Sequence, residues 1–217
     1  MIATVITLAK KINEPSYKKI GNGIAILSCL SFLFSAYSRY AFLSATFTQV
    51  LPLALCNILS FILIPLTLIK RNQTLFEFCY YSGIGGASQA LITPAIHYRI
   101  PFICSIAFYI EHALILLGIF YCLVPYTMKP KENSVIKCWL IICGYSYLSI
   151  LFNYLLNTNY CYTLHKPHGT NLITKLSPWP WYIPEASLIA LLIFSCLYLP
   201  FYISRLYKKT RSSGLRF

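Results

Sequence analysis

The sequence predicts an all-α membrane protein, a bundle of about six transmembrane helices with both termini cytoplasmic. The chain has 217 residues, of which 58% are hydrophobic and only 11% are charged. A soluble domain carries roughly 25% charged residues, so free solubility is excluded. Apolar stretches alternate with loops, and the positive charge of these loops switches between the two sides.

Each apolar stretch is close to the roughly 20 residues that cross a hydrocarbon core of about 30 Å. In chain order the predicted spans are Ile20–Tyr37, Val50–Ile69, Leu75–Thr93, Pro101–Val124, Val135–Asn157 and Ile183–Ile203. Pro65 is expected to bend the second span, because proline removes a helical hydrogen bond.

Lysine and arginine orient the bundle. Of the 18 such residues, all but four fall on the side that holds both termini; the exceptions are Arg39, Arg99, Lys166 and Lys175. Cytoplasmic loops carry an excess of Lys and Arg, so this side is predicted to be cytoplasmic.

A single domain is predicted, with a transmembrane unit at 20–203 and a long outer loop at 158–182. Residues 1–19 form a cytoplasmic arm, either an interfacial helix or unstructured, and 204–217 form a basic tail. The formal net charge of +13 fits binding to anionic lipid headgroups at the cytoplasmic face. Nucleic-acid binding is not expected, since no zinc or RNA-binding motif is present.

Cofactor chemistry has no support in the sequence. The nine cysteines are scattered singly without a CxxC pair, which argues against zinc and thioredoxin-type chemistry. His165 and His168 lie close in the outer loop but lack further ligands nearby. A phosphate-cradling glycine loop is missing. We expect neither a metal nor a cofactor.

Polar residues inside the spans are the candidates for function, because they are costly in a membrane and face other helices or a wet cavity. Counting about 1.5 Å per helical residue places them in the outer half of the bilayer. They are Cys56, Asn57, Gln89, Glu111, His112, Asn153 and Asn157. This asymmetry predicts a polar pocket on the outer side that binds membrane lipids.

His112 and Glu111 lie near the predicted midplane. His112 can accept a proton or bind a metal, and the alternative, which its position favours, is a buried histidine hydrogen-bonded to a neighbouring helix. Consecutive helical residues point about 100° apart, so Glu111 contacts a different helix or stays protonated. Cys56 alone would be interpreted as a packing residue.

The outer loop ends in Ser177-Pro178-Trp179-Pro180-Trp181-Tyr182. Trp179, Trp181 and Tyr182 form either an aromatic anchor at the outer interface or a lid over the pocket. Gly86 and Ala90, four residues apart, favour close helix packing, with a glycine break at a transport site as the alternative.

Several segments resemble those of the YwaF-type bacterial membrane proteins. The resemblance covers residues 37–203 and rests on Thr158-Asn159-Tyr160, Lys166-Pro167, Ser177–Tyr182, Leu51–Cys56, Phe76-Glu77 with Tyr80–Leu91, Thr93-Pro94 and His112. It implies a place in the bacterial cytoplasmic membrane. That family is similar to the eukaryotic membrane acyltransferases of the transmembrane protein 164 type. A more distant relation is the androgen-induced group of membrane hydrolases.

The resemblance implies a lipid acyl hydrolase or transacylase in which Cys56 is the nucleophile and His112 the base. Asn57, Gln89 and Asn153 are candidates to hold the ester oxygen. Two alternatives stay open, a small permease or lipid carrier that uses the same cavity and an accessory membrane protein without chemistry. The sequence does not predict an oligomeric state.

Overall fold

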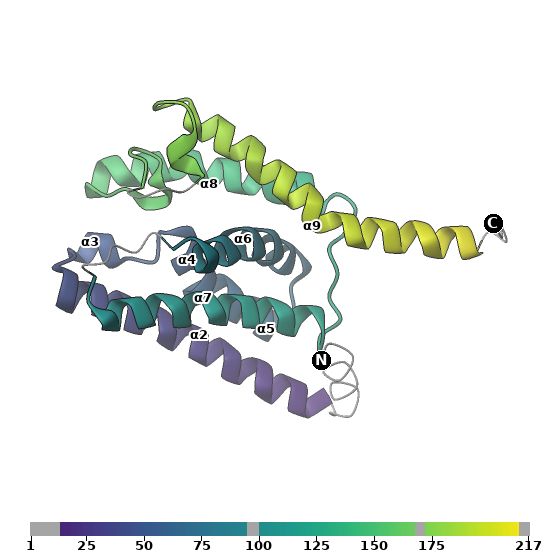
Figure 1. The fold of residues 1–217 in the computed structure, drawn as a ribbon. Coiled ribbons are helices and arrows are strands. Elements are labelled where there is room, and N and C mark those ends of the chain that lie inside the picture. The colour runs from purple at the N-terminus through teal and green to yellow at the C-terminus, as the bar shows by residue number, and fades with distance from the viewer. Residues whose placement is uncertain (1–13, 95–99, 168–171, 213–217) are drawn as a thin grey trace.

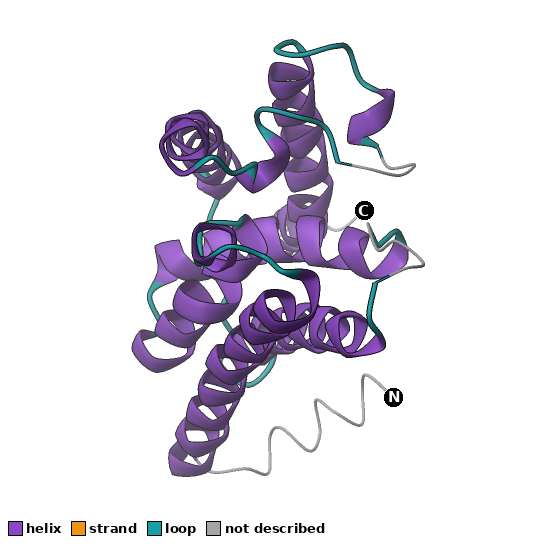
Figure 2. Ribbon diagram, turned by 90° about the vertical axis from the view of Figure 1, so that its left-hand side faces the viewer, coloured by secondary structure: helices purple, strands orange, loops and turns teal. Residues whose placement is uncertain are grey.

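The computed structural model describes residues 14–94, 100–167 and 172–212. All regular structure in these ranges is helical (Figure 2). The elements are α2 (Glu14–Leu43), α3 (Phe47–Val50), α4 (Leu55–Ile58), η1 (Leu59–Leu63), α5 (Ile64–Lys70), α6 (Gln73–Ile92), α7 (Phe102–Leu123), α8 (Ser134–Leu156), η2 (Tyr160–Tyr162), η3 (Ile173–Lys175) and α9 (Tyr182–Ser212).

The helices form two groups that meet at α6 (Figure 1). On one side α2 packs against α7 and α5, and on the other α8 pairs with α9. Helix α6 contacts both groups. Helix α2 begins and α9 ends at one end of the bundle, here called the terminal end; α3 and the α8–α9 loop lie at the opposite end, the loop end.

The predicted spans correspond to six helical segments. Four helices are long and apolar enough to cross a membrane, over Ser16–Leu43, Phe102–Leu123, Ser134–Leu156 and Tyr182–Arg211, and Leu55–Lys70 is a shorter apolar helix. The multi-pass helical architecture is therefore confirmed, and the count of six spans stays a prediction. Helix α2 starts inside the predicted arm 1–19; residues 1–13, Arg99 and His168 lie outside the described residues.

The second helix begins later than predicted. Leu51 is extended, with φ −59° and ψ 151°, and a regular helix starts only at Leu55. Pro52 explains this difference, since a proline disfavours helical geometry in the residue before it. The depth predicted for Cys56 assumed a helix from Val50 and was wrong in that respect.

Pro65 shapes this helix through a π-helical turn. Ile64 N–H bonds to Leu59 O, the spacing of a π-helix, and Pro65 has no N–H to donate. Two carbonyls are thereby left open, and α2 satisfies both. Ser28 Oγ donates to Ser60 O at 2.7 Å, and Cys29 Sγ donates to Phe61 O at 3.4 Å.

Helix α6 is the polar and aromatic core of the bundle. Its Glu77 is fully buried near the terminal end and accepts from Lys137 Nζ, from Gln73 Nε2 at 2.8 Å and from Lys131 N–H at 2.9 Å. Tyr81 stacks on Phe194 of α9 with ring centroids 5.0 Å apart. These contacts hold the α8–α9 pair to the rest of the protein.

The outward surface is apolar, as a lipid-facing surface must be. Along α9 the exposed large side chains are Leu188, Leu192, Leu199, Tyr202, Ile203, Leu206 and Tyr207.

Candidate active site

A cavity of about 680 Å³ lies between the two groups of helices toward the loop end. Residues of α2, α4, α6, α7, α8, α9 and the loop at 158–167 line it. Five of the predicted polar residues border this cavity: Cys56, Asn57, Gln89, Glu111 and His112. The volume lies within the roughly 300–1,000 Å³ of small-molecule sites.

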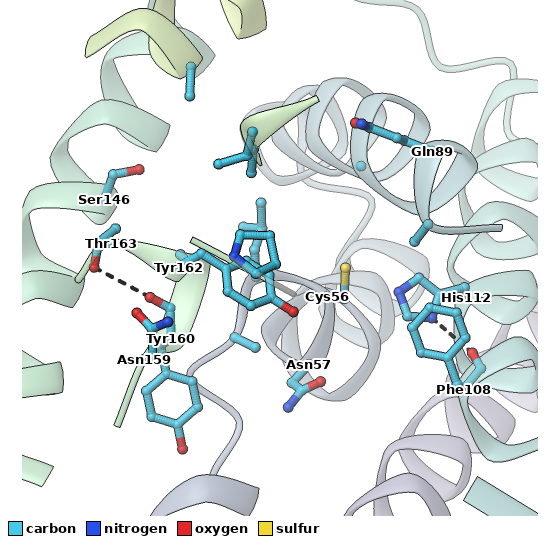
Figure 3. Close-up of a pocket in the computed structure, with 18 of the residues that line it drawn as sticks. Cys56, Asn57, Gln89, Phe108, His112, Ser146, Asn159, Tyr160, Tyr162 and Thr163 are labelled. Atoms are coloured by element: carbon cyan, nitrogen blue, oxygen red, sulfur yellow. Dashed lines mark hydrogen bonds between the residues drawn. The ribbon is translucent and has the colours of Figure 1, made fainter. Parts of the chain in front are cut away.

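Cys56 is the second residue of its helix and borders the cavity (Figure 3). Ala54, with extended φ and ψ, is the N-cap, and Ile58 N–H makes the bond to Ala54 O. The N–H groups of Cys56 and Asn57 precede that bond and belong to the donors that every helix leaves without an intrahelical partner. The positive end of the helix dipole therefore lies at the thiol.

Asn57 is buried, at 6% exposure, and its Nδ2 has no hydrogen-bond partner among the described residues. A buried amide donor without a partner costs free energy, so such an atom next to a cavity is suited to bind a ligand oxygen. The sequence singled out Asn57 as a polar span residue, and the structure adds that its amide has this free donor beside the cavity.

His112 enters the cavity from α7 (Figure 3). Its Nδ1 lies 2.8 Å from Phe108 O, and its ring packs on the Phe108 ring with centroids 4.1 Å apart. A carbonyl oxygen can only accept, so Nδ1 carries the hydrogen of a neutral ring and Nε2 keeps a free lone pair.

Glu111 points to a different partner from His112, as predicted. It is 2% exposed and accepts a 2.6 Å hydrogen bond from Ser60 Oγ in the π-helical turn. Gln89 lies on the α6 side of the cavity, and its side chain is exposed (Figure 3).

Asn153 and Asn157 do not border the cavity. Asn153 is 1% exposed, donates to Tyr160 O and Thr163 Oγ1 at 2.9 Å each, and accepts from Tyr160 N–H and Thr158 Oγ1. Asn157 ends α8 with a left-handed φ of 50°. Asn153 thus stabilises the loop at 158–163, which itself lines the cavity, and Asn157 lies where the chain leaves the helix for this loop.

The three aromatic residues predicted to form an outer anchor or a lid do not share one environment in the structure. Tyr182 is 3% exposed, lines the cavity and donates from its hydroxyl to Tyr162 O. Trp179 and Trp181 lie outside the lining and are 51% and 68% exposed. Trp179 Nε1 donates to Thr163 O at 3.1 Å.

Sequence reasoning missed further polar residues that border the cavity, among them Arg39, Cys143 and Cys161. The sequence marked Arg39 of α2 only as an outer charge, and it gave the two cysteines only as members of a scattered set of nine. Arg39 could have been suspected because it follows a long apolar stretch with few other charges.

Among residues 14–94, 100–167 and 172–212, no group of three or more His, Cys, Asp or Glu side chains is placed to hold a metal ion. His165 is exposed in the loop.

The chain matches the family model of the TMEM164 family over residues 1–198. Curated proteins and solved structures gave no match. The matched region includes the whole cavity and nearly all of the helical bundle. Together with its apolar helices, this match shows that the chain is a multi-pass membrane protein that belongs to the TMEM164 family.

Proposed function

We propose that the protein is a lipid acyl hydrolase or transacylase that forms a thioester on Cys56. The observation that carries the proposal is that Cys56, at the beginning of its helix, and His112, with a free Nε2, border one cavity inside the bundle. The residue roles are those that the family resemblance implies, and the contacts of both residues support them.

His112 suits the role of base because its orientation is fixed. The bond to Phe108 O holds Nδ1 and leaves Nε2 to accept a proton. A histidine held in this way is a competent general base once the thiol comes within hydrogen-bond reach. Its burial at 5% exposure also keeps bulk water away from the proton.

Cys56 suits the role of nucleophile because of the helix that begins beside it. The thiolate, not the thiol, attacks, and the positive end of a helix dipole stabilises negative charge. In the proposed first step His112 Nε2 takes the Cys56 proton, and the sulfur attacks the carbonyl carbon of an acyl ester. The carbonyl electrons move to oxygen.

The charge on that oxygen would be stabilised by the N–H groups at the beginning of α4 and by Asn57 Nδ2. Such donors, aimed in advance at developing charge, are usually the largest single contribution to catalysis. When the tetrahedral species collapses, the ester C–O bond breaks, and His112 returns its proton to the departing alcohol. Cys56 is then acylated.

Deacylation repeats the step with a different hydroxyl. His112 takes a proton from water or from a lysolipid hydroxyl, whose oxygen attacks the thioester, and the C–S bond breaks. With water as the acceptor the product is a fatty acid, and with a lysolipid it is a new ester. In both cases the proton returns to Cys56. Apolar lining residues such as Leu43, Ile100 and Ile142 suit the acyl chain.

The test is intact-protein mass spectrometry after incubation with phospholipid in detergent micelles. The purified proteins are wild type, Cys56→Ala and His112→Ala, with Cys143→Ala as a matched control because Cys143 lines the same cavity. We expect a hydroxylamine-sensitive acyl adduct on wild type and Cys143→Ala only. An adduct that persists in Cys56→Ala, or no adduct and no lipid turnover in wild type, would contradict the proposal.

A further inference from the structure

Arg39 is a partly buried cation for which the described parts of the chain show no carboxylate partner. It lies on α2 and lines the same cavity as Cys56 and His112. Its Nε and Nη2 atoms are buried and have no hydrogen-bond partner among the described residues. Buried charged donors without a partner are costly, so these two nitrogens next to a cavity point to a ligand that supplies acceptors.

The acidic residues of the chain have other partners or lie in other parts of the fold. The sequence has only five, all glutamate. Glu111 accepts from Ser60, Glu77 is bonded to Lys137, and Glu185 accepts from Ser177. Glu132 borders a separate pocket with Arg205, and Glu14 is the first residue of α2, at the terminal end. No protein carboxylate at the loop end is therefore assigned to Arg39 in the described ranges.

The positive charge of Arg39 influences two tyrosines in the loop that borders the cavity. Burial raises the pKa of Tyr160 and of Tyr162, and the positive charge of Arg39 opposes this rise at both hydroxyls. Both tyrosines line the cavity, and their hydroxyl and backbone groups are tied to other segments. The field of Arg39 thus extends across the loop end of the cavity.

Arg39 lies closer to the loop end than His112 does. Cys104 Sγ contacts Ser38 O at 3.4 Å, which places residue 38 of α2 beside the first turn of α7. His112 follows eight residues later on α7, a rise of roughly 12 Å along the helix at about 1.5 Å per residue. A ligand with a charged end at Arg39 would extend inward toward Cys56 and His112.

A glycerophospholipid has this order of groups, with a phosphate at the membrane surface and acyl esters on the adjoining glycerol. We propose that Arg39 binds the phosphate of a glycerophospholipid and thereby selects phospholipids over neutral glycerides. The guanidinium presents a planar fork of donors that matches two phosphate oxygens. The proposal rests on the proposed acyl chemistry for the position of the ester.

The experiment measures binding without turnover, so that it does not depend on the acyl step. Native mass spectrometry in detergent compares Cys56→Ala with Cys56→Ala/Arg39→Gln and Cys56→Ala/Arg39→Lys. The probes are a phosphatidylcholine and a diacylglycerol with identical acyl chains, and inorganic phosphate as the free-anion competitor. The control is Cys56→Ala/Arg211→Gln, which removes an exposed positive charge of α9 outside the cavity lining.

We expect Arg39→Gln to weaken phosphatidylcholine binding about tenfold to a hundredfold, as the loss of a charge-assisted hydrogen bond does, and to leave diacylglycerol binding unchanged. Arg39→Lys, which keeps the charge but loses the fork, should show an intermediate loss and also confirms that the site folds. Equal weakening of both lipids, unchanged phosphatidylcholine binding, or phosphate binding at Arg39 without lipid binding would overturn the proposal.

The acyl step is measured separately, in proteins that keep Cys56. Wild type and Arg39→Gln are assayed for the thioester with both lipids, and the expected loss is confined to phosphatidylcholine and appears in KM. A chain that binds phospholipid through Arg39 but forms no thioester would disprove the proposed acyl chemistry and leave the headgroup site intact.

Discussion

Ser60 Oγ donates a 2.6 Å hydrogen bond to Oε1 of Glu111, which is 2% exposed. The hydroxyl also lies 3.2 Å from Asn57 O, but it has one proton, and the shorter contact is the one to Glu111. This bond turns Glu111 toward the π-helical turn, whereas its neighbour His112 bonds to Phe108 O.

Ser60→Ala should therefore leave Glu111 buried without its donor. We expect the free energy of unfolding to fall by about 1–3 kcal/mol, measured by detergent titration of the purified protein in mixed micelles. The control is Ser31→Ala, whose hydroxyl donates only to Ser28 O on its own helix. Equal losses of unfolding free energy in the two variants would show that the bond to Glu111 contributes no more than a hydrogen bond within one helix.

Gly118 lets α7 approach the second helix. A Cβ at this position would lie 2.4 Å from Ile64 Cγ2. Gly118→Ala should destabilise the protein by about 1–3 kcal/mol through overpacking, seen as a lower thermal midpoint. In an Ile64→Ala background, where the opposing atoms are absent, Gly118→Ala should lower the midpoint less than it does in the wild type.

Gly144→Ala is the matched control for Gly118, because its Cβ would meet nothing within 4 Å. It should be neutral or slightly stabilising, since alanine favours a helix by about 0.5–1 kcal/mol over glycine. A Gly118→Ala protein as stable as Gly144→Ala would refute the packing argument.

Asn153 holds the loop that borders the cavity through both its amide nitrogen and its oxygen. Asn153→Ala should lower stability by about 1–3 kcal/mol and speed amide hydrogen exchange at Tyr160 and Leu164 more than in α6. Asn157→Gly serves as the comparison, because glycine accepts the left-handed backbone at that position. Unchanged exchange in the loop of Asn153→Ala would argue against the role of this network.

Cys161 gives a pH-dependent prediction in the same loop. Burial raises the pKa of its thiol from 9.0 to about 11, against an opposing hydrogen bond at the Leu55 backbone. The folded protein therefore keeps the thiol protonated at neutral pH. Its alkylation by iodoacetamide, followed on the Cys161 peptide, should rise about tenfold per pH unit between pH 8 and 10.

The raised pKa of Cys161 also makes the stability of the folded protein depend on pH. A folded-state pKa above the unfolded value means that the contribution of Cys161 is fully present below pH 9 and is lost as the pH rises toward 11. In the unfolded chain the alkylation rate should level off above pH 9. A folded protein that levels off at the same pH would show that Cys161 is not buried as described.

The membrane fold could be predicted from the sequence because it depends on local composition. Lipid accepts only long apolar helices, so each of these spans leaves a visible signal in hydropathy and charge. The same constraint confines polar residues to protein interiors or cavities, and Cys56, Asn57, Glu111 and His112 all border one cavity.

What such a polar residue contacts was decided only by tertiary structure. Asn153 and Asn57 are both buried amides in spans, yet the first is satisfied by a loop ten residues or fewer away and the second keeps a free donor beside the cavity. The beginning of the second helix at Leu55 and the unpartnered guanidinium of Arg39 likewise depend on how distant helices meet. Hydropathy determines which segments enter the membrane, but hydrogen-bond partners are set by packing between segments far apart in the chain.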